Sequence, residues 1–187
     1  MQNVRVFFEK TGMTKYISHL DLMRCMTRAI KRAAIPAWYT EGFNPHLFIT
    51  FALPLTLGVE SLCESMDIRL TEEMGFEEVK NRLNVNLPDG IRITNVAVPV
   101  YKANDIAFAE YKITFHTRKN EKIKNEIEEK LLGDELLAEK MGKQGKRKVL
   151  KTINLKEFVN SYSVISLNDK TVLTAVLTAC LLYTSPS

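Results

Sequence analysis

Three side chains near the N-terminus suit acid–base or metal chemistry: His19, Asp21 and His46. His19 stands at a predicted helix start, where the helix dipole lowers the pKa of an imidazole and favours the neutral form that a general base needs. Alternatively, Ser18 and Asp21 cap the helix and His19 is simply exposed or hydrogen-bonded. The three side chains together would make a metal-ligand set. Two histidines and one carboxylate far apart in sequence are a weak signal, so no metal site is predicted.

His46 closes a segment that has the residues of a rigid turn, Gly42-Phe43-Asn44-Pro45. Glycine accepts a positive φ, asparagine bonds its own backbone, and proline fixes the chain beyond it. A turn does not explain His46 or the nearby aromatic residues, which could stack on bases or on a substrate ring. Aromatic residues beside a strand also pack in cores, so both interpretations stay open. The residues that would shape a substrate pocket are Asp21, Tyr39, Gly42, Phe43 and Asn44.

Basic residues gather in two places. One is the face of the first predicted helix that lies opposite its apolar stripe, and a solvated helix face is the alternative interpretation there. The other is the run MGKQGKRKVLK, where two glycines loosen the chain. Closely spaced cations release counterions from a nucleic-acid backbone, so we expect contacts with RNA phosphates. The residues expected to make them are Arg24, Arg28, Lys146, Arg147 and Lys148.

The composition allows one ordinary domain or two small ones. The chain has 187 residues, of which 45% are hydrophobic and 26% are charged, which is enough apolar material for a buried core. With 26 basic and 22 acidic side chains the net charge is only +4, so the overall charge permits an anionic partner without requiring one.

Cysteine usage and the N-terminal sequence indicate a reduced, cytoplasmic protein without a membrane span. Cys25, Cys63 and Cys180 are widely spaced and form neither a CxxC pair nor the CxxxCxxC cluster of radical SAM enzymes. The first residues alternate in polarity and carry charges, unlike a signal peptide. No cofactor is predicted for this chain.

Residue patterns predict an order β-α-β-β-α-β in the first half, residues 1–100. The predicted elements are Val4 to Glu9, about His19 to Ala34, Phe48 to Leu53, Ser61 to Leu70, a helix marked by Phe76, Val79, Leu83 and Val85, and Ile91 to Val98. The two middle strands should form a hairpin, because Pro54 and Gly58 interrupt the pattern between them. This order is the ferredoxin-like arrangement.

The order starts again in residues 101–179, with a predicted strand at Tyr111 to Phe115 and a helix at Glu121 to Leu132. Further predicted strands are Lys148 to Ile153, Tyr162 to Leu167 and Val172 to Leu177. The fold class is therefore expected to be α+β, with tandem ferredoxin-like (βαββαβ) units of which the second is incomplete.

The last eight residues, 180–187, read CLLYTSPS and look foreign to what precedes them. They resemble translated sequencing-adapter sequence, so we expect a non-native tail without function. On this interpretation the natural protein continues beyond about Ala179 and supplies the final helix and strand of the second unit.

Two long motifs carry a resemblance to a known family. YISHLDLMR followed by YTEGFNPHLFITFALPLTLGVES resembles the radical-SAM-linked protein family, a domain of unknown function found alone or fused behind a radical SAM protein. The family commonly has proline at the position of Leu47 and serine or a similar residue at that of Thr40, so this chain departs mildly from the pattern. The resemblance covers most of Val4 to Ala179 and implies a radical SAM partner. Family members tend to be encoded near ribosomal-protein and RNA-processing functions, which points to RNA.

Three hypotheses of function follow. The leading one is an accessory module that presents RNA or a ribosome-associated substrate to a radical SAM enzyme. The second is an RNA-processing or RNA-modifying enzyme that uses His19 or His46 as general acid or base, which requires both histidines in one cleft. The third is a purely protein-binding subunit whose charged ridge meets an acidic face of the radical SAM partner.

Overall fold

The computed structural model describes residues 1–117, 119–144 and 147–179. The chain divides into two compact units, with the boundary between Ile106 and Ala107. Both units are mixed α+β, and all described strand pairs are antiparallel. None of the described helices is both long and apolar enough to cross a membrane.

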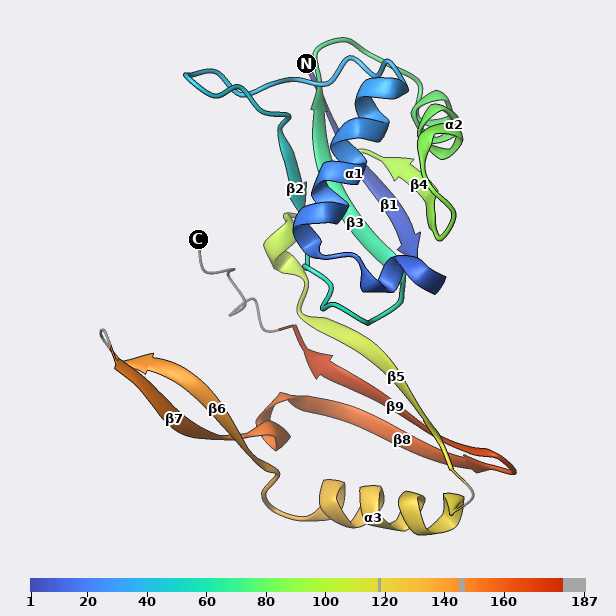
Figure 1. The fold of residues 1–187 in the computed structure, drawn as a ribbon, viewed down its shortest axis with the longest axis vertical. Coiled ribbons are helices and arrows are strands. Elements are labelled where there is room, and N and C mark those ends of the chain that lie inside the picture. Colours follow the sequence, from blue (N-terminus) through green and yellow to red (C-terminus); the bar gives the residue numbers. More distant parts are fainter. Residues whose placement is uncertain (118, 145–146, 180–187) are drawn as a thin grey trace. The chain divides into compact units, whose positions relative to one another are not determined.

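Unit 1 has the predicted order of strands and helices. Its elements are β1 Gln2–Lys10, α1 His19–Arg32, β2 Ile49–Phe51, β3 Ser61–Leu70, α2 Phe76–Asn86 and β4 Ile91–Ala97. The strands form one sheet in the order β2-β3-β1-β4, and β2 and β3 make the predicted hairpin. Figure 1 shows α1 running across the face of β1 and β3, with α2 beside β4.

The core of unit 1 lies between this sheet and its two helices. Alternate residues of β1 point to the helices, and Val4, Val6 and Phe8 are fully buried. Helical spacing aligns the apolar residues of α1 and α2 into stripes that pack on this face. The helix residues buried there are Leu22, Met26, Ala29, Ile30, Val79 and Leu83.

The first turn of α1 is capped as predicted. The Ser18 hydroxyl accepts a hydrogen bond from the Asp21 backbone N–H at 3.1 Å, and it donates to the Asp21 carboxylate at 2.7 Å. An N-terminal carboxylate also suits the positive end of the helix dipole. Ala34, with φ 49°, and then Pro36 take the chain out of the helix, two residues earlier than the predicted end.

Gly90 lies in the connection between α2 and β4, next to the residue that follows β1. Its backbone has φ +89°, and its carbonyl accepts a hydrogen bond from Thr11 N at 2.8 Å. A Cβ at Gly90 would lie 2.6 Å from Thr11 O. The approach of these two backbone segments therefore requires glycine.

Unit 2 contains a three-stranded sheet and a separate hairpin. Its elements are β5 Phe108–His116, α3 Asn120–Leu132, β6 Leu137–Gln144, β7 Arg147–Asn154, β8 Val159–Leu167 and β9 Lys170–Thr178. The sheet order is β5-β9-β8, and β6 pairs only with β7 among the described strands. The predicted elements of the second half lie within β5, α3, β7, β8 and β9.

The strand β6 was not predicted. Its sequence, LAEKMGKQ, is rich in lysine and contains a glycine, so the sequence favoured a loosened loop. The register of the hairpin sets Gly142 opposite Val149 and Lys140 opposite Lys151. Pairing with β7, a non-local contact that residue patterns do not reveal, decides the structure of this segment.

Candidate functional site

Three arginines of α1 line one open pocket. Arg24, Arg28 and Arg32 are four residues apart, about 6 Å along the helix axis, and therefore follow one side of the helix. The last residues of α2 and the turn after it form the opposite wall, and the pocket has a volume of about 680 Å³. We call it the arginine pocket, and its lining residues are Asp21, Arg24, Cys25, Arg28, Arg32, Val85, Asn86, Leu87 and Pro88.

The amphipathic pattern of α1 explains this placement. Leu22, Met26 and Ile30 turn one side of the helix to the sheet, so the arginines are left on a side that faces α2 and solvent. The Arg32 guanidinium donates to the Asn86 carbonyl at 2.6 Å. That carbonyl belongs to the last residue of α2, where the helix dipole favours a cation.

Two of the three arginines have hydrogen-bond partners in the part of the chain that the structure describes. Arg24 donates to the Asp21 carboxylate at 3.2 Å, in an ion pair that is more than half exposed on both sides. The Ser18 hydroxyl and then Arg24 hold the pKa of Asp21 below its ordinary value. Arg28 makes no hydrogen bond or ion pair within the described residues. Asp21, predicted as a substrate contact, thus belongs to this pocket.

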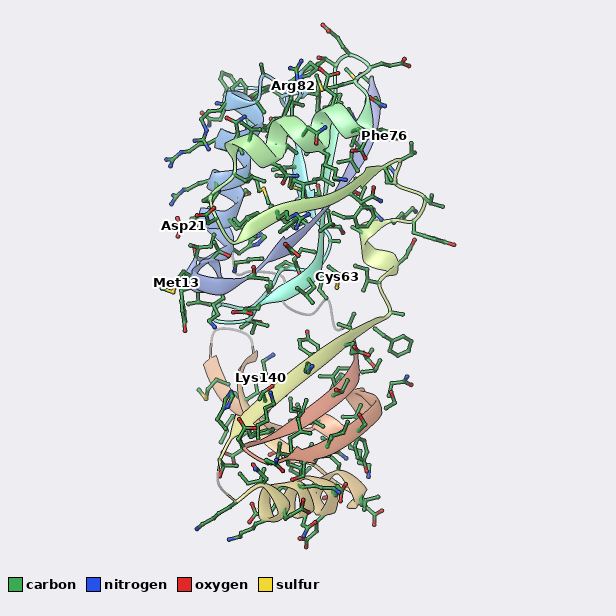
Figure 2. All side chains as sticks on the ribbon, turned by 90° about the vertical axis from the view of Figure 1, so that its right-hand side faces the viewer. Met13, Asp21, Cys63, Phe76, Arg82 and Lys140 are labelled. Atoms are coloured by element: carbon green, nitrogen blue, oxygen red, sulfur yellow. The ribbon has the colours of Figure 1, made fainter. Side chains whose placement is uncertain are left out.

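Cys25 also lines the arginine pocket. Burial raises the pKa of its thiol, with a smaller opposing effect from Arg32 and Arg28. The thiol therefore stays protonated near neutral pH and is a poor nucleophile. Cys63 lies on the face of β3 turned away from the helices (Figure 2).

His46 makes hydrogen bonds within the loop that connects α1 to β2, and these bonds hold the two sides of the loop together. The Thr40 hydroxyl lies 2.9 Å from His46 Nδ1 and accepts from His46 N at 3.1 Å, while Nδ1 is 3.2 Å from the Asn44 carbonyl. Gly42 has φ +123°, as a turn that needs glycine would have. The loop holds Phe43 at its tip, where the ring is fully exposed.

The remaining aromatic residues of this loop are paired with cations. The Lys31 ammonium lies over the Tyr39 ring, 5.5 Å from its centre. The Arg69 guanidinium lies 5.0 Å from the centres of both Trp38 and Phe48. The sequence analysis missed Arg69, because a contact between a strand residue and a distant loop leaves no local pattern.

His19 has surroundings of a different kind. Its ring meets the edge of Phe51, with the centres 5.0 Å apart and the planes at 77°. Burial lowers its pKa, and the charge of Lys10 lowers it further. The rings of His19 and His46 share no contact among the described residues, and His46 bonds only within its own loop. A cleft shared by the two histidines therefore stays a prediction.

Lys10, whose charge acts on His19, and Glu64, whose charge acts on Lys10, are ionisable residues that the sequence analysis missed. Lys10 is 1% exposed, and its ammonium donates to the Ile17 carbonyl at 3.3 Å. Burial lowers the pKa of Lys10, and Glu64 partly offsets this. Burial likewise raises the pKa of Glu64, against smaller effects of Ser61 and Lys10. The alternation of β1 was the available signal, since it sets Lys10 on the same face as Phe8.

For the predicted RNA contacts in the second basic run, the structure gives less detail. Lys146 lies outside the described residues, and for Arg147 and Lys148 the structure describes the backbone, which belongs to β7. His19, Asp21 and His46 are not brought together, and no group of three potential metal ligands occurs within the described ranges.

Residues 3–184 match the model of a protein family described as "Uncharacterized protein conserved in bacteria (DUF2344)". No curated protein matches the chain.

Proposed function

The chain belongs to this uncharacterized bacterial family, and we propose that it is an RNA-binding accessory module of a radical SAM enzyme. The observation that carries the RNA part of the proposal is the arginine pocket. It gathers three guanidinium groups along one side of α1, with Asp21 as the only acidic side chain in its lining.

Guanidinium groups in this arrangement suit a phosphate backbone. Each one is planar, permanently charged and able to donate two parallel hydrogen bonds to a phosphate. A row of them spaced about 6 Å apart along a helix can meet successive phosphates of one strand. Binding would release counterions and would therefore depend on salt.

The exposed ring of Phe43 supports RNA over other polyanions. A fully exposed aromatic side chain at the tip of an ordered loop is costly in water and offers a stacking face for an unpaired base. The loop that carries it begins just after the C-terminal end of α1, the helix that holds the arginines. Phosphate contacts and a stacking ring together are typical of single-strand binding.

The radical SAM partner is proposed from the two sequence motifs, YISHLDLMR and the longer GFNPH-containing run. In this role the chain positions the RNA, and the partner supplies the radical chemistry. RNA that is already held on a separate module can be delivered to the partner's site in a fixed orientation.

We also propose that both units are ferredoxin-like. The sheet order β2-β3-β1-β4, with both helices of unit 1 against one face, supports this for unit 1. In unit 2 the order β5-β9-β8 has the arrangement of β1-β3-β2, and α3 occupies the place of α1 in the chain order. On this interpretation the hairpin β6-β7 is an insertion between α3 and β8.

A second candidate function is favoured by the cluster of Lys10, His19 and Glu64. In all three residues the environment opposes the charged form, which is the arrangement that general acids and bases require. An RNA-modifying enzyme with His19 as general acid or base therefore stays a hypothesis. It needs no contribution from His46.

The decisive experiment measures binding of a fluorescein-labelled, single-stranded RNA of mixed sequence by anisotropy over a range of salt concentrations. The variant with Arg24→Gln and Arg28→Gln should bind at least tenfold more weakly at low salt. Loss of two phosphate contacts should flatten the slope of log affinity against log salt by about 1.4.

Arg92→Gln is the matched control. Arg92 is exposed on β4 between the buried residues Ile91 and Ile93, so it lies on the face of the sheet opposite α1. The Arg92→Gln variant should bind RNA with the same affinity and salt dependence as the wild type. Equal affinity and equal salt slope for all three proteins would refute the phosphate role of the arginine pocket and favour the protein-binding hypothesis.

A further inference from the structure

The two walls of the arginine pocket differ in chemistry. The wall from α1 carries the guanidinium groups of Arg24, Arg28 and Arg32, whereas the opposite wall, Val85 to Pro88, contains no charged residue. A phosphate therefore meets cations on one side of the pocket alone. A ligand that fills the pocket needs an anionic part for α1 and an uncharged part for the wall opposite.

The wall opposite α1 offers mainly apolar atoms. Val85 is 85% exposed, and Pro88 is exposed as well. Two polar groups of Asn86 are already engaged, since its carbonyl accepts from Arg32 and its side-chain amide donates to the Arg82 carbonyl at 2.9 Å. Val85 is not part of the core of unit 1, so its aliphatic surface is available to a ligand.

The pocket is bounded at one end and beneath. The Arg32 guanidinium bonds the Asn86 carbonyl at 2.6 Å and so joins the two walls near the C-terminal end of α1. Cys25 and Leu87 line the pocket and also pack against the core, so they form its floor. A volume of about 680 Å³ is typical of small-molecule sites and is sufficient for one nucleotide.

We propose that the arginine pocket holds one unpaired nucleotide of the RNA. Its phosphates lie on Arg24 and Arg28, and its base packs on the aliphatic surface of Val85 and Pro88. The bases of a single strand project away from the phosphates and can be splayed out, so a strand that follows α1 can turn one base to the opposite wall. This inference rests on the proposed RNA function and adds that the pocket recognises a base as well as phosphates.

Two ligands of equal charge test this inference by fluorescence anisotropy at one salt concentration. The first is the labelled single-stranded RNA, and the second is a labelled chain of abasic ribose phosphates of the same length. The wild type should prefer the RNA. Val85→Ser should reduce this preference about fivefold, because the base loses apolar contact area, and it should leave the affinity for the abasic chain unchanged.

Val100→Ser is the matched control. Val100 is 82% exposed, much as Val85 is, and it does not line the arginine pocket. This variant should keep the wild-type preference for RNA over the abasic chain. Since Phe43 is unchanged in all the proteins compared, a lower preference in Val85→Ser alone assigns the base contact to the pocket.

The variant with Arg24→Gln and Arg28→Gln distinguishes this inference from the proposed function. It should bind both ligands more weakly than the wild type. If it does so while Val85→Ser keeps the wild-type preference, this inference is overturned, and RNA binding by phosphate contacts is retained. If the arginine variant binds both ligands as tightly as the wild type, the proposed function and this inference both fail.

Discussion

Lys10 stands where β1 would otherwise place another apolar side chain. Val4, Val6 and Phe8 precede it on the face that points to the helices, and all three are fully buried. The buried ammonium has one described hydrogen bond, to the Ile17 carbonyl at 3.3 Å. The nearby Glu64 carboxylate only partly offsets the effect of burial, so the buried charge is expected to lower stability.

Lys10→Met should therefore raise the free energy of unfolding by about 1 kcal/mol near neutral pH, as replacement of buried charges by apolar residues does. The pKa of Lys10 in the folded state lies below its ordinary value of 10.5, so the folded protein binds fewer protons than the unfolded chain. The stability of the wild type should consequently rise as the pH rises towards this value, and its difference from Lys10→Met should shrink. Urea unfolding at neutral and alkaline pH measures both effects.

Lys15→Met is the control for this experiment. The Lys15 ammonium bonds Glu60 at the surface at 3.0 Å, and this bond raises its pKa. The change should give no gain in stability. A Lys10→Met variant that is less stable than the wild type, or whose advantage does not change with pH, would show that the Lys10 charge is well compensated in the fold. Loss of activity in a stabilised Lys10→Met variant would favour the enzyme hypothesis.

At the scale of elements, Gly90 holds the connection between α2 and β4 against the end of β1. Gly90→Ala should lower the free energy of unfolding by about 2 to 3 kcal/mol, because the residue has a positive φ and its Cβ would meet Thr11 O at 2.6 Å. Gly58→Ala is the matched control, since Gly58 has φ +86° and no atom within 4 Å of its Cβ position. It should lose only about 1 kcal/mol. Equal losses in urea unfolding would show that the backbone approach at Gly90 relaxes freely.

Local residue patterns were sufficient to predict the helices and strands that bury one face. The alternation of β1 and the apolar stripe of α1 predicted both elements, and the Ser18 cap was found from residue types alone. β6 escaped prediction because its structure depends on pairing with β7. The candidate site followed the same rule. Arg24 and Arg28 stood out on one helix, whereas the opposite wall of their pocket comes from the end of α2 and the residues after it, Val85 to Pro88, which are distant in sequence.

At the scale of the whole molecule, the buried core is unequally shared between the two units. The continuous hydrophobic cluster runs from Val4 to Val96 and belongs wholly to unit 1. Among the described apolar residues of unit 2, only Val172 and Ala175 are buried. Since buried apolar area is the main source of folding free energy, unit 2 should be much the less stable of the two.

Urea unfolding of the whole chain should accordingly show two transitions rather than one. The first should report unit 2, because this unit has the smaller buried core. The second should report unit 1. Near-ultraviolet circular dichroism follows unit 1 through Trp38, the chain's one tryptophan, while far-ultraviolet dichroism follows both units.

Val172→Ala supplies the control, because Val172 is buried in unit 2. Its first transition should move to lower urea, while its second should coincide with that of the wild type, since no residue of the unit 1 core has changed. A single cooperative transition seen by both probes would contradict this account, because it would mean that contacts between the units contribute as much to stability as the core of unit 1.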